Sequence, residues 1–257
     1  MGNKTINNEQ GHWVLAKMGK RVLRPGGKEL TLKLIDHLNI NSNDSVVEFA
    51  PGLGDTASIV LQNDPKTYIG IELNEEAAIL LQKKIGGKGR EIIVGNATKS
   101  TLPDTSVKKV FGEAMLTMQA DHRKSEIIKE AHRILQPGGL YGIHELGMLD
   151  DTKDITKQWI QKSLAEVIKV NARPLMVKEW VNLLEKEGFV IKKIETNSMQ
   201  LLETKRVIED EGFFRAMRIG FNILTHPSAR QRILAIRRIF RKHEEYLNGV
   251  AIIAEKQ

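Results

Sequence analysis

The stretch VVEFAPGLGDTA, residues 46–57, decides the fold of this chain. It begins as a run of strand-forming residues, breaks at a glycine-rich turn and resumes as a helix. Because Gly52 and Gly54 project no side chain, the backbone of the turn can approach a ligand closely. With Ala57 they match the loose G-x-G-x-x-A dinucleotide fingerprint, a weak signal that gains value from its place between a strand and a helix. Glu48 stands inside the strand, where a hydride-transfer enzyme usually has an apolar residue.

The composition indicates a folded protein with room for one large domain. The chain has 257 residues, of which 41% are hydrophobic, and its charges are of mixed sign. No apolar run approaches the roughly 20 residues that span a bilayer, and the first ten residues lack a signal core, so we expect a cytoplasmic protein. The absence of cysteine excludes disulfides, thiolate metal sites and cysteine nucleophiles. A net charge of +7 is compatible with a basic enzyme that has no anionic partner, or with a protein that binds nucleic acid or a membrane surface.

Strand and helix signals alternate from Ser45 to about residue 150. Strands alternating with helices predict a parallel sheet covered on both faces, and ligands bind such sheets beyond the carboxyl ends of the strands. Residues before Lys28 are predicted to be irregular. After further helices come two strand-like segments, separated by a helical stretch at about 204–245. The predicted strands of the first part are SVVEFA, TYIGIEL, EIIVG, VKKVFGEA and LYGIHEL.

Polar residues follow the second and third predicted strands. Glu72 ends the second strand, where a carboxylate can accept both hydroxyls of a ribose. A favourable charge at the start of the next helix is the alternative role for Glu72. After the third strand, the amide of Asn96 can bond the edge of an adenine, and small Ala97 lets a flat ring approach; capping of its own loop is the alternative for Asn96. Together, the polar groups at these strand ends predict a site for an adenosine-like ligand.

At these residues the sequence resembles the class I S-adenosylmethionine-dependent methyltransferases. The family's first motif, E/D-x-G-x-G-x-G, stands here as EFAPGLG, residues 48–54. The turn ILQPGG, residues 134–139, is typical of the small-molecule branch that includes ubiquinone and menaquinone biosynthesis enzymes. The resemblance spans roughly residues 40–150, and it departs from the family pattern at Ala50, in place of the first glycine, and at Asn96, where aspartate is common.

The resemblance implies an α/β, Rossmann-like fold with S-adenosyl-L-methionine as cofactor. The expected sheet has seven mostly parallel strands with helices on both faces, an antiparallel last strand and a helical insertion before it. We divide this single methyltransferase domain, 1–257, into an N-terminal cap (1–40), a cofactor-binding core (41–150) and a substrate-side half (151–257). The resemblance places Glu48 near the methionine end of the cofactor. The residues predicted to bind the cofactor are Glu48, Ala50, Pro51, Gly52, Gly54, Glu72, Leu73, Asn96, Ala97, Glu113 and Met115.

Catalytic candidates follow the fourth and fifth strands. His144 and Glu145 are adjacent, point to opposite faces of a regular strand, and are the two candidates for a general base. The alternative makes His144 a hydrogen-bonded structural group and Glu113 a cofactor contact only. Gln119 and His122 are further polar candidates. The spacing of the seven histidines predicts no metal site.

The predicted activity is in-line methyl transfer to a small, apolar or aromatic acceptor. An RNA methyltransferase and a non-catalytic S-adenosylmethionine-binding protein are the alternatives, the first favoured by charge alone. No N/D-P-P-Y/F stretch follows the fourth strand, which argues against the adenine-N6 and related amino-methylating nucleic-acid enzymes. Few aromatic residues interleave with the arginines of the helical stretch, so we do not expect a nucleic-acid partner. The basic stretch ARQRILAIRRIFRK predicts a docked helix with Ile233, Ile236 and Phe240 inward. Peripheral contact with a lipid surface, an anionic substrate or RNA is the alternative role for its arginines. No oligomeric state is predicted.

Overall fold

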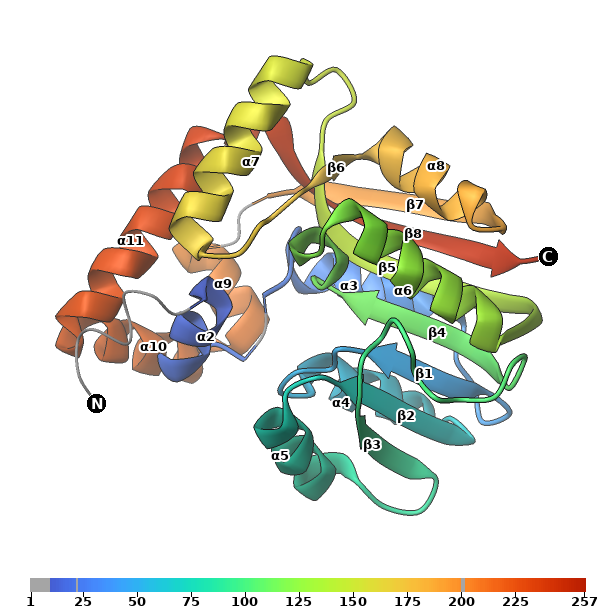
Figure 1. Ribbon diagram of the computed structural model, residues 1–257. Coiled ribbons are helices and arrows are strands. Elements are labelled where there is room, and N and C mark those ends of the chain that lie inside the picture. Colours follow the sequence, from blue (N-terminus) through green and yellow to red (C-terminus); the bar gives the residue numbers. More distant parts are fainter. Residues whose placement is uncertain (1–9, 22, 200–201) are drawn as a thin grey trace.

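A mixed α/β sheet forms the centre of the computed structural model, which describes residues 10–21, 23–199 and 202–257 (Figure 1). Residues 1–9 of the expected N-terminal cap, and residues 200–201 at the end of a predicted strand, lie outside the described residues, as does Val22. The strands are β1 Ser45–Phe49, β2 Thr67–Glu72, β3 Arg90–Val94, β4 Val107–Glu113, β5 Leu135–Met148, β6 Leu175–Met176, β7 Phe189–Ser198 and β8 Leu247–Lys256.

The strand order is β3-β2-β1-β4-β5-β8-β7. Strands β1 to β5 are parallel, and β8 runs antiparallel between β5 and β7. This confirms the expected sheet with its antiparallel last strand. The two-residue strand β6, which was not predicted, pairs with the end of β5 and brings the sheet to eight strands. Because the order reverses between β1 and β4, the crevice for a ligand opens at the carboxyl ends of these two strands.

Helices cover both faces of the sheet. On one face the apolar side chains of α3, α4 and α5 pack over β1, β2, β4 and β8; for example Leu30, Leu34 and Leu38 of α3 are completely buried. On the other face α6 and α8 pack over the same strands and β5, with Trp180 of α8 buried. These helices are α3 Gly27–Leu38, α4 Asp55–Val60, α5 Glu75–Ile85, α6 Asp121–Ile134 and α8 Val177–Lys186.

Local signals account for several element boundaries. Asn74 is the N-cap of α5 as predicted, since its side chain accepts a hydrogen bond of 2.8 Å from the Ala77 amide. Helix α6 ends at Ile134, and β5 begins at once with Leu135. The QPGG segment therefore lies within β5, where the pairing with β4 shifts register, and does not form a separate turn.

A second group of helices gathers beyond the carboxyl ends of the parallel strands (Figure 1). Helix α11 contacts α2 and α7 and buries Ile233, Ile236 and Phe240, as predicted. Helix α2 corrects the expectation that the chain before Lys28 is irregular. Within the described residues no helix is both long and apolar enough to cross a membrane. The group consists of α2 Gly11–Lys17, α7 Asp154–Ile168, α9 Thr204–Glu211, α10 Phe213–Thr225 and α11 Pro227–Lys242.

Candidate cofactor site and adjoining cavity

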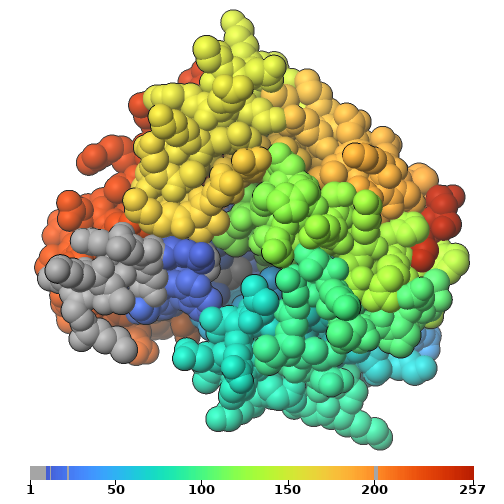
Figure 2. Space-filling model, in the orientation of Figure 1, coloured from blue at the N-terminus to red at the C-terminus, as the bar shows by residue number. Residues whose placement is uncertain are grey.

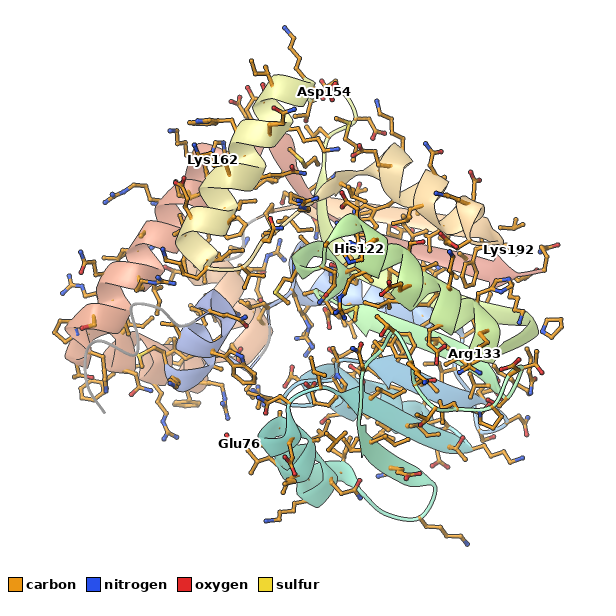
Figure 3. All side chains as sticks on the ribbon, in the orientation of Figure 1. Glu76, His122, Arg133, Asp154, Lys162 and Lys192 are labelled. Atoms are coloured by element: carbon orange, nitrogen blue, oxygen red, sulfur yellow. The ribbon has the colours of Figure 1, made fainter. Side chains whose placement is uncertain are left out.

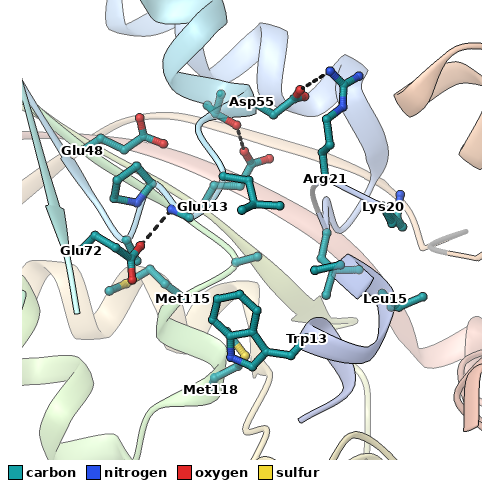
Figure 4. Close-up of a pocket in the computed structure, with 18 residues that line it drawn as sticks. Trp13, Leu15, Lys20, Arg21, Glu48, Asp55, Glu72, Glu113, Met115 and Met118 are labelled. Atoms are coloured by element: carbon teal, nitrogen blue, oxygen red, sulfur yellow. Dashed lines mark hydrogen bonds and ion pairs between the residues drawn. The ribbon is translucent and has the colours of Figure 1, made fainter. Parts of the chain in front are cut away.

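A cavity with about 930 Å³ of empty space lies between the carboxyl ends of β1, β2 and β4 and the segment around α2 (Figure 4). Seven of the residues predicted to bind the cofactor line it: Glu48, Ala50, Pro51, Gly52, Glu72, Glu113 and Met115. The other four, Gly54, Leu73, Asn96 and Ala97, do not.

The turn after β1 uses its small residues in three different ways. Gly52 has φ +55°, and a Cβ there would meet nothing within 4 Å, so it would project into open space. Gly54 has φ +72°, and a Cβ there would lie 2.1 Å from Leu81 of α5, so this glycine serves close packing. Ala50 also adopts a positive φ, +55°. Ala50 therefore adopts a left-handed conformation that glycine takes without strain, at a cost of roughly 1–2 kcal/mol.

Glu72 ties the turn to the start of α5. One of its carboxylate oxygens accepts a 2.9 Å hydrogen bond from the Gly52 amide, and the other accepts one of 2.9 Å from the Asn74 amide. The carboxylate is buried and still lines the cavity. The structure supports the role of Glu72 at the beginning of the helix, and a contact of Glu72 with a ribose stays a prediction.

The loop after β3 does not reach the cavity. Asn96 caps this loop, because its side-chain oxygen accepts a 3.0 Å hydrogen bond from the Thr98 amide. Ala97 packs within the core, and Leu73 is exposed to solvent outside the cavity. The structure thus favours the loop-capping alternative for Asn96, and an adenine contact of these three residues stays a prediction.

Glu48 is a buried acid that forms no ion pair with the described residues. Its side chain is 2% exposed and accepts a 2.5 Å hydrogen bond from the Tyr68 hydroxyl. Burial raises the pKa of Glu48 to about 8; the charge of Glu113 adds to the rise, while the Tyr68 hydrogen bond and Arg24 oppose it. A positively charged ligand stabilises the ionised form of a buried carboxyl group whose pKa is raised. The methionine end of S-adenosylmethionine carries two such charges, a sulfonium and an ammonium.

Glu113 lies at the centre of a buried polar cluster. Thr31 donates a 2.6 Å hydrogen bond to its Oε1, Thr56 donates to its Oε2, and Arg24 Nε lies 3.4 Å from Oε1. His144 Nδ1 is 2.9 Å from the same oxygen. Burial would raise the pKa of Glu113, but His144, Arg24 and Thr31 outweigh it and hold the pKa near 2. The cluster joins β4, β5, α3, α4 and the segment before α3.

His144 and Glu145 are both completely buried, and neither lines the cavity. The imidazole of His144 faces acceptors on both sides, since its Nε2 lies 2.5 Å from the Pro25 carbonyl oxygen and its Nδ1 faces Glu113. Glu145 accepts hydrogen bonds of 2.8–3.0 Å from the amides of residues 115–117 and one from the Thr117 hydroxyl. The two side chains do point to opposite sides of β5. Their geometry gives neither of them direct access to an acceptor in the cavity.

The segment around α2, which was expected to be irregular, forms a wall of the cavity. Trp13 and Leu15 both line the cavity, and Trp13 extends toward Met118 (Figure 4). The space-filling view shows this blue segment next to the cyan residues that follow β1 (Figure 2). Arg21 bridges Asp55 of α4, at 3.4 Å, and Glu211 of α9, at 3.1 Å. The available signal was the basic cluster KRVLRPGG, residues 20–27, whose acidic partners lie far away in the sequence.

An apolar cavity with about 650 Å³ of empty space adjoins the first one. None of the described residues that line it is titratable. Of the other polar candidates, Gln119 and His122 line neither cavity, and His122 lies exposed at the beginning of α6 (Figure 3). Within the described ranges, no three His, Asp or Glu side chains come together in a way that could hold a metal ion. The two cavities share Leu15, Leu23, Ala114 and Met118.

The fold and site define an α/β enzyme that binds a nucleoside-type cofactor at the switch point of its sheet. The family model described as "Methyltransferase domain" matches residues 47–143. An uncharacterized protein of Haemophilus influenzae is 30% identical over 253 residues, which cover 97% of this chain and 99% of that protein. An uncharacterized methyltransferase of Oceanobacillus iheyensis is 31% identical over 159 residues, 58% of this chain and 70% of that protein.

Among solved structures, the S-adenosylmethionine-dependent methyltransferase of Thiobacillus denitrificans, in complex with S-adenosylhomocysteine, aligns with a TM-score of 0.69. The two chains are 13% identical, and the alignment covers 96% of this chain and 98% of that one. The chain belongs to the class I S-adenosylmethionine-dependent methyltransferases, and S-adenosylmethionine is its cofactor. The open space at Gly52 and the carboxyl groups of Glu48 and Glu72 fit this group.

We expect cofactor binding to tighten as the pH rises toward 8. A cation favours ionised Glu48, so below its pKa of about 8 a proton has to leave when the cofactor binds. The affinity should rise by up to about tenfold per pH unit below pH 8 and level off above it. Titration calorimetry in buffers of different ionisation enthalpy measures the proton release. Glu48→Gln should flatten the pH dependence, whereas Glu75→Gln, an exposed carboxylate on α5, should not. A wild-type profile as flat as that of Glu48→Gln would contradict this role.

Proposed function

We propose that the protein transfers a methyl group from S-adenosylmethionine to a small molecule with an apolar body. The observation that carries the proposal is the apolar cavity that adjoins the cofactor cavity and shares Leu15, Leu23, Ala114 and Met118 with it. An acceptor seated there would reach the cofactor past these shared residues. The cofactor supplies the activated methyl, so the protein has to bind, align and desolvate the acceptor.

We further propose that the acceptor needs no general base from the protein. The apolar cavity has no titratable side chain among the described residues that line it. Two polar groups of its lining residues are already engaged: the Thr117 hydroxyl donates to Glu145, and the Pro25 carbonyl accepts from His144. A thiolate or an acidic phenol is a nucleophile in the absence of such help. In this proposal His144 and Glu145 are positioning residues, which hold the segment before α3 and the loop after β4.

The activity test is transfer of labelled methyl from S-adenosylmethionine into a metabolite extract. The expected result is labelled product of low mass that partitions into organic solvent. Label that appears in RNA, or no label at all, would contradict the proposal; in the second case a thermal shift with the cofactor would identify a binding protein without turnover.

A second experiment tests the acceptor cavity separately from the cofactor cavity. Val170 is partly exposed and lines the apolar cavity only, so Val170→Trp should fill it. We expect turnover to fall about tenfold or more while the thermal shift with S-adenosylmethionine is kept. Val190→Trp, on β7 and 43% exposed, is the matched control and should keep full turnover. Unchanged turnover in Val170→Trp would place the acceptor elsewhere without affecting the cofactor assignment.

A further inference from the structure

Helix α10 carries an apolar face that points to solvent. Five of its large apolar side chains are more than half exposed, and Phe214 is 87% exposed. They recur every three to four residues, so they lie along one side of the helix. Contiguous apolar surface of this kind marks an interaction site on a folded protein. We call this surface the α10 face; it consists of Phe213, Phe214, Met217, Phe221 and Leu224.

The opposite side of α10 fixes the helix to the rest of the protein. Ile219 is buried there, and Asn222 Nδ2 donates a 3.0 Å hydrogen bond to the Met18 carbonyl. Arg215 Nη1 donates one of 3.3 Å to the Gly19 carbonyl. Because these contacts hold the inner side at the end of α2, the α10 face is turned outward by a defined packing.

The α10 face lies in a strongly cationic part of the chain. Between Gly212 and His243 the sequence has no Asp or Glu. Glu203 engages Arg237 and Arg241. Arg218 of α10 and Arg230 at the beginning of α11 are exposed. The full set of cations in this range is Arg215, Arg218, Arg230, Arg232, Arg237, Arg238, Arg241 and Lys242.

We propose that α10 docks on an anionic lipid surface, with the α10 face among the acyl chains and the neighbouring arginines at the headgroups. An amphipathic helix with phenylalanine and leucine on one side and arginine beside them is suited to a membrane interface. A second copy of the chain fits less well, because a two-fold contact would bring the same arginines together. RNA fits less well, because a convex helix offers no groove that tracks a nucleic-acid backbone.

Docking would also bring the cavities close to the membrane. Helix α10 packs on the turn that follows α2, and Leu15 of α2 lines both cavities. An apolar acceptor dissolved in the bilayer would then be near the enzyme that uses it. The docking proposal goes beyond the proposed function and stands without it, because its evidence is the α10 face and its charge.

The test is sedimentation of the full-length protein with lipid vesicles. We expect binding to vesicles of phosphatidylcholine and phosphatidylglycerol in equal parts, and at least tenfold weaker binding to phosphatidylcholine alone. The double variant Phe214→Ser, Phe221→Ser should bind at least tenfold more weakly. Ile155→Ser on α7, where the isoleucine is 77% exposed, is the matched control and should bind like wild type. Arg218→Gln should weaken binding about fivefold, and Lys88→Gln, in the exposed turn before β3, should not.

Each outcome of the test has a definite meaning. Since the replaced phenylalanines are exposed, the double variant should keep its melting temperature and its thermal shift with S-adenosylmethionine. Failure of the wild type to bind anionic vesicles, or equal binding by the double variant, would overturn the proposal. So would a wild-type dimer in sedimentation velocity that the double variant dissolves, or RNA retention that the same variant loses.

Discussion

Replacement of Gly52 by valine is expected to weaken S-adenosylmethionine binding by about 100-fold or more, because the new side chain would stand in the cofactor cavity. A steric clash that costs about 3 kcal/mol on binding would by itself lower the affinity by about 100-fold. The fold should survive, since a Cβ at this position meets no protein atom within 4 Å. The positive φ of the residue should cost only about 1–2 kcal/mol of stability. Calorimetric titration with the cofactor, together with a denaturant melt, measures both effects.

Gly138→Val is the matched control for this experiment. Gly138 also has a positive φ, +74°, and open space at its Cβ, but it lies at the beginning of β5 and outside the cofactor cavity. It should therefore lose similar stability and keep its affinity for the cofactor. If Gly52→Val binds the cofactor like Gly138→Val, the ligand does not occupy the space over the turn, and the placement of the site is wrong.

Replacement of Glu113 by alanine is expected to lower the free energy of unfolding by about 3–5 kcal/mol. The variant leaves Arg24 and His144, both completely buried, without their shared carboxylate. Glu113→Gln, which keeps two polar atoms in place, should lose less. Glu126→Ala on the exposed side of α6 should change stability by no more than about 0.5 kcal/mol. Denaturant melts at neutral pH compare the three variants.

The pH dependence of this effect has a defined sign. The pKa of Glu113 in the folded protein, near 2, lies below its ordinary value of 4.5. The stability that it contributes is therefore present above about pH 4.5 and is lost as the pH falls from 4.5 toward 2. The difference between wild type and Glu113→Ala should shrink over that range. A loss below about 1 kcal/mol at neutral pH would show that the cluster around Glu113 is not a main support of the fold.

The sheet and the acid–glycine turn could be predicted because their signals are local. Residues close together in the sequence determine the strands, the N-cap at Asn74 and the turn at residues 52–54. Seven of the residues predicted to bind the cofactor do line the cavity. The wall formed by the segment around α2 could not be predicted in this way. Arg21 and Glu211 form an ion pair across 190 positions of sequence, and no periodicity links them.

The candidates on β5 show where strand alternation stops being informative. Alternation correctly placed His144 and Glu145 on opposite sides of the sheet, yet both sides are completely buried. Whether a polar side chain on a strand faces substrate or a structural partner depends on the loops that cover the strand end. Here the loop after β4 turns its amides toward Glu145, and the residues before α3 bring the Pro25 carbonyl to His144.

The long-range pairing of Lys20 and Arg21 with Asp210 and Glu211 has a consequence for synthesis of the chain. Every residue of the glycine turn is synthesised early. Asp210 and Glu211, which hold the segment that follows α2, emerge from the ribosome about 190 residues after Lys20 and Arg21. A nascent chain that ends at β5 would carry the complete motif and still lack a closed cavity. We therefore expect the enzyme to retain its cofactor only near the end of translation, when α9 has packed against residues 20 and 21.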